Sequence, residues 1–386
     1  MDNSHFNASP QASHGRGERV SAPSVDGTAR VESIKLGIDV AVDSCVVVRQ
    51  VDNAAPQPGQ HFKLVEFLPW VQKQLAFADA VYSCYEAGPF GYGLHRSLTA
   101  MGVRNVVIRP QNWDEFGKRV KTDRTDALAM VQRLDRYAAG NDKALAVVRV
   151  PTVEEELARS RVRQREQFKR ESQRLAAQGR SLLLYYGIRT TGSWWAPDAW
   201  PSLQERIKQN HPDHAGEAMI EMLSDYQSMV IAAQDELVKL TKQLEKAAVS
   251  KERRPRGLGA LGYEKLRREV CDWRRFSNRR QVASYTGLCP GAHGTGGVIH
   301  GTSITKHGNP QLRADLIELA WLLPMYQPKY PPLVKRAHIL LNGKAPKTAR
   351  KKAIVAVARH LAIDLWRIQT GRAQPSDVGL ELRVER

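Results

Sequence analysis

The chain has 386 residues, more than one hydrophobic core usually organises, so we expect two or three domains. Its formal net charge is +18, which predicts a polyanionic partner, namely nucleic acid, although a solvated basic surface is the alternative. The four cysteines form no C-x-x-C pair, which argues against a zinc site or disulfide framework and favours a reducing cytoplasm. No run reaches the roughly 18 apolar residues of a spanning helix, so no membrane partner is expected.

The first 32 residues are rich in Ser, Ala, Gly and Asn. They contain no apolar core of a signal peptide and no membrane anchor, and we expect a disordered tail.

Residues 33–150 alternate short β-rich runs with helical periodicity, which predicts an α/β domain. The order βββαβαβα, with acids ending the first and fourth strands and opening a late helix, is typical of a ribonuclease-H-like core. The predicted strands are Lys35–Val40, Ser44–Gln50, His61–Phe67, Ala80–Glu86 and Asn105–Ile108, and the assigned helices are Gly91–Met101 and Thr122–Tyr137.

Residues 151–250 change to long charged helix after Pro151. Three acids, Glu154–Glu156, suit the start of a helix that continues to Gln178. Gly187–Asp213 is predicted to be irregular, and a second helix follows from Ala215 to Ala248 with apolar residues at helical spacing. Two such helices predict an antiparallel coiled-coil arm.

Residues 251–372 are predicted to form a mostly helical last domain, and residues 373–386 a tail. The domain contains a glycine-rich loop, Gly291–Gly297, then Ser303 and a helix from Gln311 to Met325, and a basic helical segment, Lys335–Arg372. Its basic side chains are candidates for nucleic-acid binding: Arg253, Arg254, Arg256, Lys306, Arg313, Arg350, Lys351 and Lys352.

Four acids stand where a metal-dependent phosphodiester enzyme needs them. Asp39 and Glu86 end apolar strands, where an unpaired buried carboxylate is costly, and Asp123 and Asp126 are neighbours on one helical face. Carboxylates of this kind hold Mg²⁺, and two ions about 4 Å apart stabilise an in-line phosphoryl transfer. Helix capping is the alternative for Asp123 and Asp126, and Asp43, in a turn, is a competing ligand.

An ordered set of motifs from Ile34 to Thr370 resembles the DEDD transposases of the insertion-sequence family numbered one hundred and ten. The motifs are Gly37-Ile-Asp39-Val, Tyr85-Glu86-Ala-Gly88, Lys121-Thr-Asp-Arg-Thr-Asp126-Ala, Val148-Arg-Val-Pro151 with Glu154–Glu156, Ser284-Tyr-Thr-Gly-Leu-Cys-Pro290, Ile304-Thr-Lys-His-Gly-Asn309 and Leu312-Arg313.

The resemblance implies a RuvC-like catalytic domain, a helical arm that mediates assembly, and a C-terminal transposase domain with a serine nucleophile. It also implies a bacterial, nucleoid-associated homo-oligomer, a dimer or tetramer, whose subunits share the reaction and use a structured bridge RNA that pairs with target and donor DNA. By motif match, Asp39, Glu86, Asp123 and Asp126 take the metal positions, with Mg²⁺ as the cofactor.

The chain departs from the family at the nucleophile. Where the family has Ser before Gly, this sequence has Thr295 before Gly296. A threonine hydroxyl can attack phosphorus, but its β-branch restricts the rotamers. Ser303 is the alternative nucleophile, Thr295 as a plain turn residue is the other interpretation, and His293 is a candidate for orienting a phosphate.

The leading prediction is therefore a transposase that cuts and rejoins DNA strands. One alternative is a metal-dependent nuclease, such as a Holliday-junction resolvase, in which water is the nucleophile. A second is a nucleic-acid-binding derivative of a transposase without catalysis.

Overall fold

The computed structural model describes residues 30–111, 122–248, 254–295 and 298–383. The chain divides into two compact units, Met1–Val150 and Pro151–Arg386, and each is described by itself. Arg253 and Lys121 lie outside the described residues, as does most of the predicted N-terminal tail.

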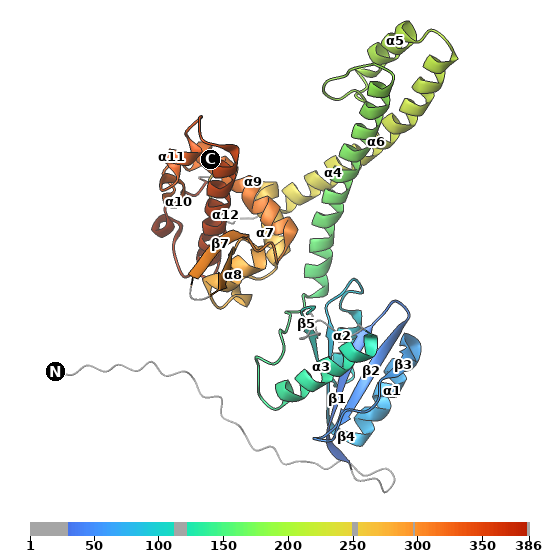
Figure 1. Cartoon of the computed structure of the whole chain (residues 1–386), viewed down its shortest axis with the longest axis vertical. Helices are drawn as coiled ribbons and strands as arrows, with labels where there is room; N and C mark the ends of the chain where they lie inside the picture. Colours follow the sequence, from blue (N-terminus) through green and yellow to red (C-terminus); the bar gives the residue numbers. More distant parts are fainter. Residues whose placement is uncertain (1–29, 112–121, 249–253, 296–297, 384–386) are drawn as a thin grey trace, which may run out of the picture. The chain divides into compact units, whose positions relative to one another are not determined.

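The first unit is an α/β fold built on a mixed five-stranded sheet, in the order β3-β2-β1-β4-β5 (Figure 1). β1 pairs antiparallel with β2 and parallel with β4, and β5 continues the parallel part. The elements are β1 (Val31–Val40), β2 (Ser44–Val51), β3 (Gln60–Lys63), α1 (Leu64–Phe77), β4 (Ala78–Glu86), α2 (Gly93–Ala100), β5 (Arg104–Ile108) and α3 (Asp123–Ala138). This is the predicted order of strands and helices.

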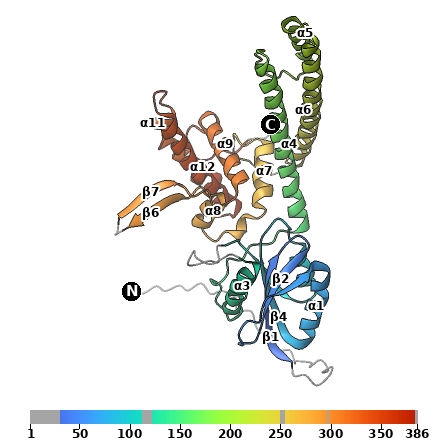
Figure 2. The ribbon, with the colours of Figure 1, turned by 45° about the vertical axis from the view of Figure 1, so that its right-hand side comes forward.

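Helices cover both faces of this sheet because the strand residues alternate between them. Ile34, Leu36 and Ile38 of β1 share a buried core with residues of α1 and α2. Residues 35, 37 and 39 lie on the other face, where α3 packs across β1, β2 and β4. Figure 2 shows α1 and α3 on opposite sides of the sheet.

The predicted third strand is wrong in its second half. It ends at Lys63, and Leu64 begins α1. Phe67 and Val71 are four residues apart and both fully buried against the sheet, so tertiary packing selects a helix despite Pro69 within it.

The second unit begins with two long helices, α4 (Val153–Tyr185) and α6 (His214–Ala247), that pack along one another (Figure 1). They run antiparallel, because Leu183 shares a core with Met219 while Arg165 donates to Thr241 Oγ1 at 2.8 Å much further along. Their connection, predicted to be irregular, contains the helix α5 (Trp200–Asn210), which buries Leu203 and Ile207 beside Trp194.

The remainder of the second unit is mostly helical around one large apolar core. Its elements are α7 (Ala260–Val270), the 3-10 turn η1 (Trp273–Arg275), α8 (Arg279–Thr286), β6 (Pro290–Thr295), β7 (Val298–Ile304), α9 (Pro310–Tyr326), α10 (Pro331–Val334), α11 (Ala337–Leu340), α12 (Lys347–Gln369) and the 3-10 turn η2 (Pro375–Val378).

The described part of the predicted C-terminal tail, residues 373–383, packs into this core. Val378 and Leu380 are buried in it, and Leu382 forms a β-bridge with Pro255. The division of the second unit into an arm and a separate last domain stays a prediction.

Candidate functional site

Strand register places two of the four predicted acids side by side. Ile38 of β1 pairs with Tyr85 of the parallel strand β4. Asp39 and Glu86 each follow by one residue, so they stand at the same end of neighbouring strands, and both are half-buried.

Both acids lie on the face that α3 covers. Gly37 and Cys84 are paired in the register, and each is two residues before its acid, hence on the same face. Cys84 Sγ donates to the carbonyl of Met130 at 3.7 Å, and a Cβ on Gly37 would lie 2.6 Å from Val131 N. The absence of a side chain at Gly37 lets α3 approach the strand.

The direction of α3 brings its first turn toward the same end. Lys35 Nζ forms an ion pair with Asp135 Oδ1 at 2.6 Å, while Gly37, further along β1, meets α3 one to two turns earlier, at Val131 and Ala127. The helix therefore runs antiparallel to β1. Its start, with Asp123 and Asp126, points toward the strand end that carries Asp39.

A threonine, and neither aspartate, supplies the side-chain cap of α3. Thr122 Oγ1 accepts from Thr125 N at 3.3 Å, and Thr125 Oγ1 accepts from Thr122 N at 3.1 Å, which together form a capping box. Asp123 is exposed and Asp126 is half-buried. The capping alternative for these two acids is thus reduced to the general preference for negative charge in a first helical turn.

Two buried thiols lie next to the acids and stay neutral. Burial raises the pKa of Cys45 to about 12, and the charge of Asp39 adds to the effect. Burial, with a contribution from Glu86, raises the pKa of Cys84 further. Neither cysteine is a thiolate ligand at neutral pH, so the oxygens of the acids are the anionic donors here.

Glu86 already accepts one hydrogen bond. Its Oε1 receives Gln111 N at 3.1 Å, and the Gln111 side chain in turn receives Arg133 Nη1 at 2.9 Å. This arrangement holds the carboxylate near the end of β5 without an ion pair between described residues.

The donor set fits a hard cation such as Mg²⁺, because carboxylate oxygens from β1, β4 and α3 face one end of the sheet. Among the residues that the structure describes, no three His, Cys, Asp or Glu side chains converge into a metal-binding cluster as they stand. The roles of the four acids stay a prediction.

The close approach of Gly37 to α3 makes a specific prediction. Gly37→Ala should lower the free energy of unfolding of the first unit by about 1–3 kcal/mol, because the new Cβ overlaps helix backbone that cannot move aside alone. Denaturant unfolding measures it. The control is Gly93→Ala, where no atom lies within 4 Å of the new Cβ; an equal decrease in both variants would contradict the close approach.

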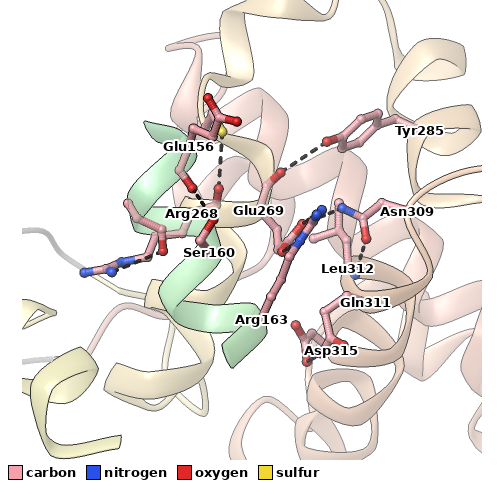
Figure 3. Close-up of polar contacts among 12 residues, drawn as sticks. Glu156, Ser160, Arg163, Arg268, Glu269, Tyr285, Asn309, Gln311, Leu312 and Asp315 are labelled. Atoms are coloured by element: carbon pink, nitrogen blue, oxygen red, sulfur yellow. Dashed lines mark hydrogen bonds and ion pairs between the residues drawn. The ribbon is translucent and has the colours of Figure 1, made fainter. Parts of the chain in front are cut away.

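In the second unit, the buried carboxylate of Glu269 is the centre of a polar network (Figure 3). It receives Arg163 Nε of α4 at 3.2 Å and Asn309 Nδ2 at 2.6 Å. The Glu269 carbonyl accepts from Tyr285 Oη at 3.1 Å, and Asn309 N donates to the Tyr285 carbonyl at 2.8 Å. One residue of α7 thereby joins α4, the end of α8 and the start of α9.

The same network fixes the two ends of the hairpin β6–β7. Thr305 N donates to the Cys289 carbonyl at 2.9 Å and Lys306 N to that of Gly287 at 3.2 Å. Arg313 Nη1 donates to the Lys306 carbonyl at 3.1 Å. The two sequence motifs at residues 284–290 and 304–309 are therefore adjacent in space.

The predicted glycine-rich loop is wrong as to structure: Pro290–Thr295 form a strand that pairs antiparallel with β7 (Figure 2). Thr295 ends the strand opposite Val298, and Ser303 is exposed on β7. The side chains of Thr295 and His293 lie outside what the structure describes. Thr295 and the four acids belong to different units.

The predicted nucleic-acid-binding residues divide into two groups. Four are exposed: Arg256, Lys306, Lys351 and Lys352. Three are drawn inward: Arg254 is buried, Arg313 donates to backbone carbonyls, and the half-buried Arg350 lies over the Trp321 ring at 6.0 Å. Charge in the sequence does not distinguish these groups, because the difference is set by tertiary packing.

Sequence reasoning did not single out Glu269 or a run of arginines at residues 274–280. Glu269 has no motif of its own. The arginines carried a signal that was available, since no acid occurs between Asp272 and Asp315.

With the fold described, the chain can be compared with known proteins. Residues 254–333 match the model of the transposase IS116/IS110/IS902 family. The chain is 30% identical to the candidate transposase y4qE of Sinorhizobium fredii over 78% of this chain and 71% of that protein. It is 31% identical to the candidate transposase y4rJ of the same organism over 73% and 75%. It is also 25% identical to the transposase for insertion sequence element IS1533 of Leptospira borgpetersenii, over 58% and 65%.

These similarities define the class as transposase, with DNA as the partner. The chain belongs to the IS116/IS110/IS902 transposase family, as its motifs indicated. Within the described ranges, none of the helices has the length and apolar character needed to cross a bilayer.

Proposed function

We propose that this transposase cleaves and rejoins the DNA strands of its insertion sequence with a Mg²⁺-binding four-acid site and a hydroxyl nucleophile. The observation that supports it most is the register of β1 with β4, which puts Asp39 and Glu86 at one strand end, toward which α3 points its first turn. In this proposal the first unit is a RuvC-like catalytic domain.

Asp39, Glu86, Asp123 and Asp126 would hold the metal. Bound Mg²⁺ would supply charge stabilisation to the phosphate under attack. The neutral thiols of Cys45 and Cys84 would leave coordination to the carboxylates, and the Gln111 amide would orient Glu86.

Thr295 takes the nucleophile position in the proposal, with Ser303 as the alternative. The hydroxyl oxygen forms a bond to phosphorus and releases its proton to solvent, and the bond from phosphorus to the departing strand breaks, leaving a hydroxyl on that strand. The result is a phosphodiester link between protein and DNA. Attack by a DNA hydroxyl on that link rejoins the strands and restores the side chain.

The finer parts of the proposal concern assembly and guidance. We propose that α4 and α6 act as a coiled-coil arm in a dimer or tetramer, and that a bridge RNA selects the DNA sites at the bacterial nucleoid. Their support is the family membership and the antiparallel packing of the two helices.

The nucleophile is tested by substitution and by trapping. Thr295→Ala should abolish recombination of a mini-element in cells and the protein–DNA adduct trapped in vitro, whereas Thr295→Ser should retain both, because it keeps the hydroxyl and removes the β-branch. Ser303→Ala is the matched control on the same hairpin. Peptide mapping of the adduct identifies the linked residue.

The outcomes separate the rival functions. Full recombination by Thr295→Ala with an adduct at Ser303 would move the nucleophile to Ser303. DNA cleavage that persists in both alanine variants without any adduct would show a nuclease that uses water. Absence of cleavage and adduct in the wild-type protein, with DNA binding intact, would show a derivative without catalysis.

A further inference from the structure

Four arginines lie close together in the sequence on η1 and at the start of α8: Arg274, Arg275, Arg279 and Arg280. Arg274, Arg279 and Arg280 are exposed, and Arg275 is half-buried. None of the four side chains forms an ion pair or hydrogen bond with any residue that the structure describes. By contrast, the nearby Arg267 and Arg268 are both paired with Glu264, at 2.8 and 2.5 Å.

The surroundings offer no negative side chain in sequence. From Trp273 to Ala314 the chain has no Asp or Glu, and this segment comprises η1, α8 and the whole hairpin β6–β7. Lys306 and His307 add exposed basic side chains at the end of the hairpin that lies against residues 285–289. A cluster of unpaired guanidinium groups repels itself, and a polyanion would relieve that repulsion.

The cluster rests on a rigid support. The Arg275 guanidinium lies over the Tyr285 ring, with Cζ 4.7 Å from the centroid, and at 5.5 Å from that of Phe276. Tyr285 is held by its hydroxyl bond to the Glu269 carbonyl (Figure 3). A stacked guanidinium keeps its N–H groups available at its edge.

The start of α8 is fixed in the same way. Asn278 Oδ1 accepts from Arg280 N at 2.9 Å and from Gln281 N at 3.1 Å. This cap sets Arg279 and Arg280 in the first helical turn, where the positive end of the helix dipole adds to their charge.

We propose that the surface formed by Arg274, Arg275, Arg279 and Arg280 binds the phosphate backbone of duplex DNA. Guanidinium groups match phosphate geometry, and binding to the backbone fixes the position of a protein on DNA without reading its sequence. The inference rests on the proposed function only in taking DNA as the ligand, and it requires neither the metal site nor the nucleophile.

The test is the salt dependence of DNA affinity, measured by fluorescence anisotropy on a labelled duplex in EDTA, so that no cleavage occurs. Each phosphate that the protein no longer neutralises lowers the slope of log K against log salt by about 0.9. Changing all four arginines to Gln should lower the slope by about 3, so that a fourfold dilution of salt strengthens wild-type binding about 60-fold more than variant binding. A double variant, Arg279→Gln with Arg280→Gln, keeps the Arg275 stack and should lower the slope by about 1.8.

The control removes the same charge elsewhere in the second unit, through Arg161→Gln, Lys208→Gln, Lys242→Gln and Lys246→Gln, all at exposed positions of α4, α5 and α6. Its slope should stay within about 1 of the wild type. An equal fall in the control would mean that net charge alone acts, and an unchanged slope in the double and quadruple variants would overturn the proposal. Weaker binding to a structured RNA with an unchanged DNA slope would overturn it in favour of RNA.

Discussion

Replacing Asp39 or Asp126 with Asn should abolish recombination of a mini-element, by roughly three orders of magnitude or more. Each change removes an anionic oxygen while keeping the shape, and a loss of about 4 kcal/mol in transition-state stabilisation is about a thousandfold in rate. Counting recombined junctions in cells measures it. Asp142→Asn, an exposed acid in the same unit, should recombine like the wild type.

The same variants have a readout that does not depend on activity. If the acids bind Mg²⁺, adding the ion should raise the unfolding temperature of the wild-type protein, because a ligand that binds only the folded state stabilises it. The Asp39→Asn protein should show little or none of this increase, and Asp142→Asn should show all of it. Recombination within tenfold of wild type in Asp39→Asn would remove that residue from the site.

Replacing Lys265 with Met should lower the free energy of unfolding by about 3–5 kcal/mol. Lys265 Nζ lies 2.5 Å from Asp315 Oδ1 and 3.0 Å from Glu166 Oε1, and all three side chains are less than 10% exposed. The substitution leaves two buried carboxylates without their shared cation, although Arg165 still reaches Glu166. Chemical denaturation measures the decrease.

Two comparisons distinguish the effect of charge pairing from that of packing. Lys239→Met removes an exposed pair with Glu236 on α6 and should cost at most about 1 kcal/mol. Adding Glu166→Gln and Asp315→Asn to Lys265→Met should recover part of the stability, because no buried charge is then left alone. No recovery would mean that the packing of the lysine stem is what matters.

The pH dependence has a defined sign. Burial alone would lower the pKa of Lys265, but the carboxylates of Asp315 and Glu166 raise it above its usual value. Its contribution to stability is therefore complete below the unfolded-state pKa of about 10.4 and is lost as the pH rises through the folded-state value. The difference in stability between wild type and Lys265→Met should shrink only in that alkaline range.

The sequence allowed the order of strands and helices in the first unit to be predicted, because each strand is a short apolar run. The acids were recognisable because Asp39 and Glu86 end such runs. Their adjacency was not, since it depends on the pairing of β1 with β4 and on the close approach of α3 at Gly37. A single glycine in an apolar strand does not reveal which helix will pack against it.

The errors have physical causes as well. The run from Leu64 to Phe67 has strand-like composition, and only its burial against the sheet makes it helical. The glycines of residues 291–297 suggested a loop, but a β-ladder is made by backbone groups, which glycine also provides. The inward position of Arg254 and Arg313 follows from packing that no local pattern encodes.

Cys45 and Cys84 give the first unit a built-in reporter of opening. Both thiols are buried and protonated on strands beside the acids, whereas the other two cysteines, Cys271 and Cys289, belong to the second unit and are half-buried. Alkylating reagents act on accessible thiolate, so modification of Cys45 and Cys84 must wait for the sheet to separate from its helices. The rate of alkylation at these two positions therefore counts excursions of this sheet, one unit at a time, in a protein whose native cysteines need no engineering.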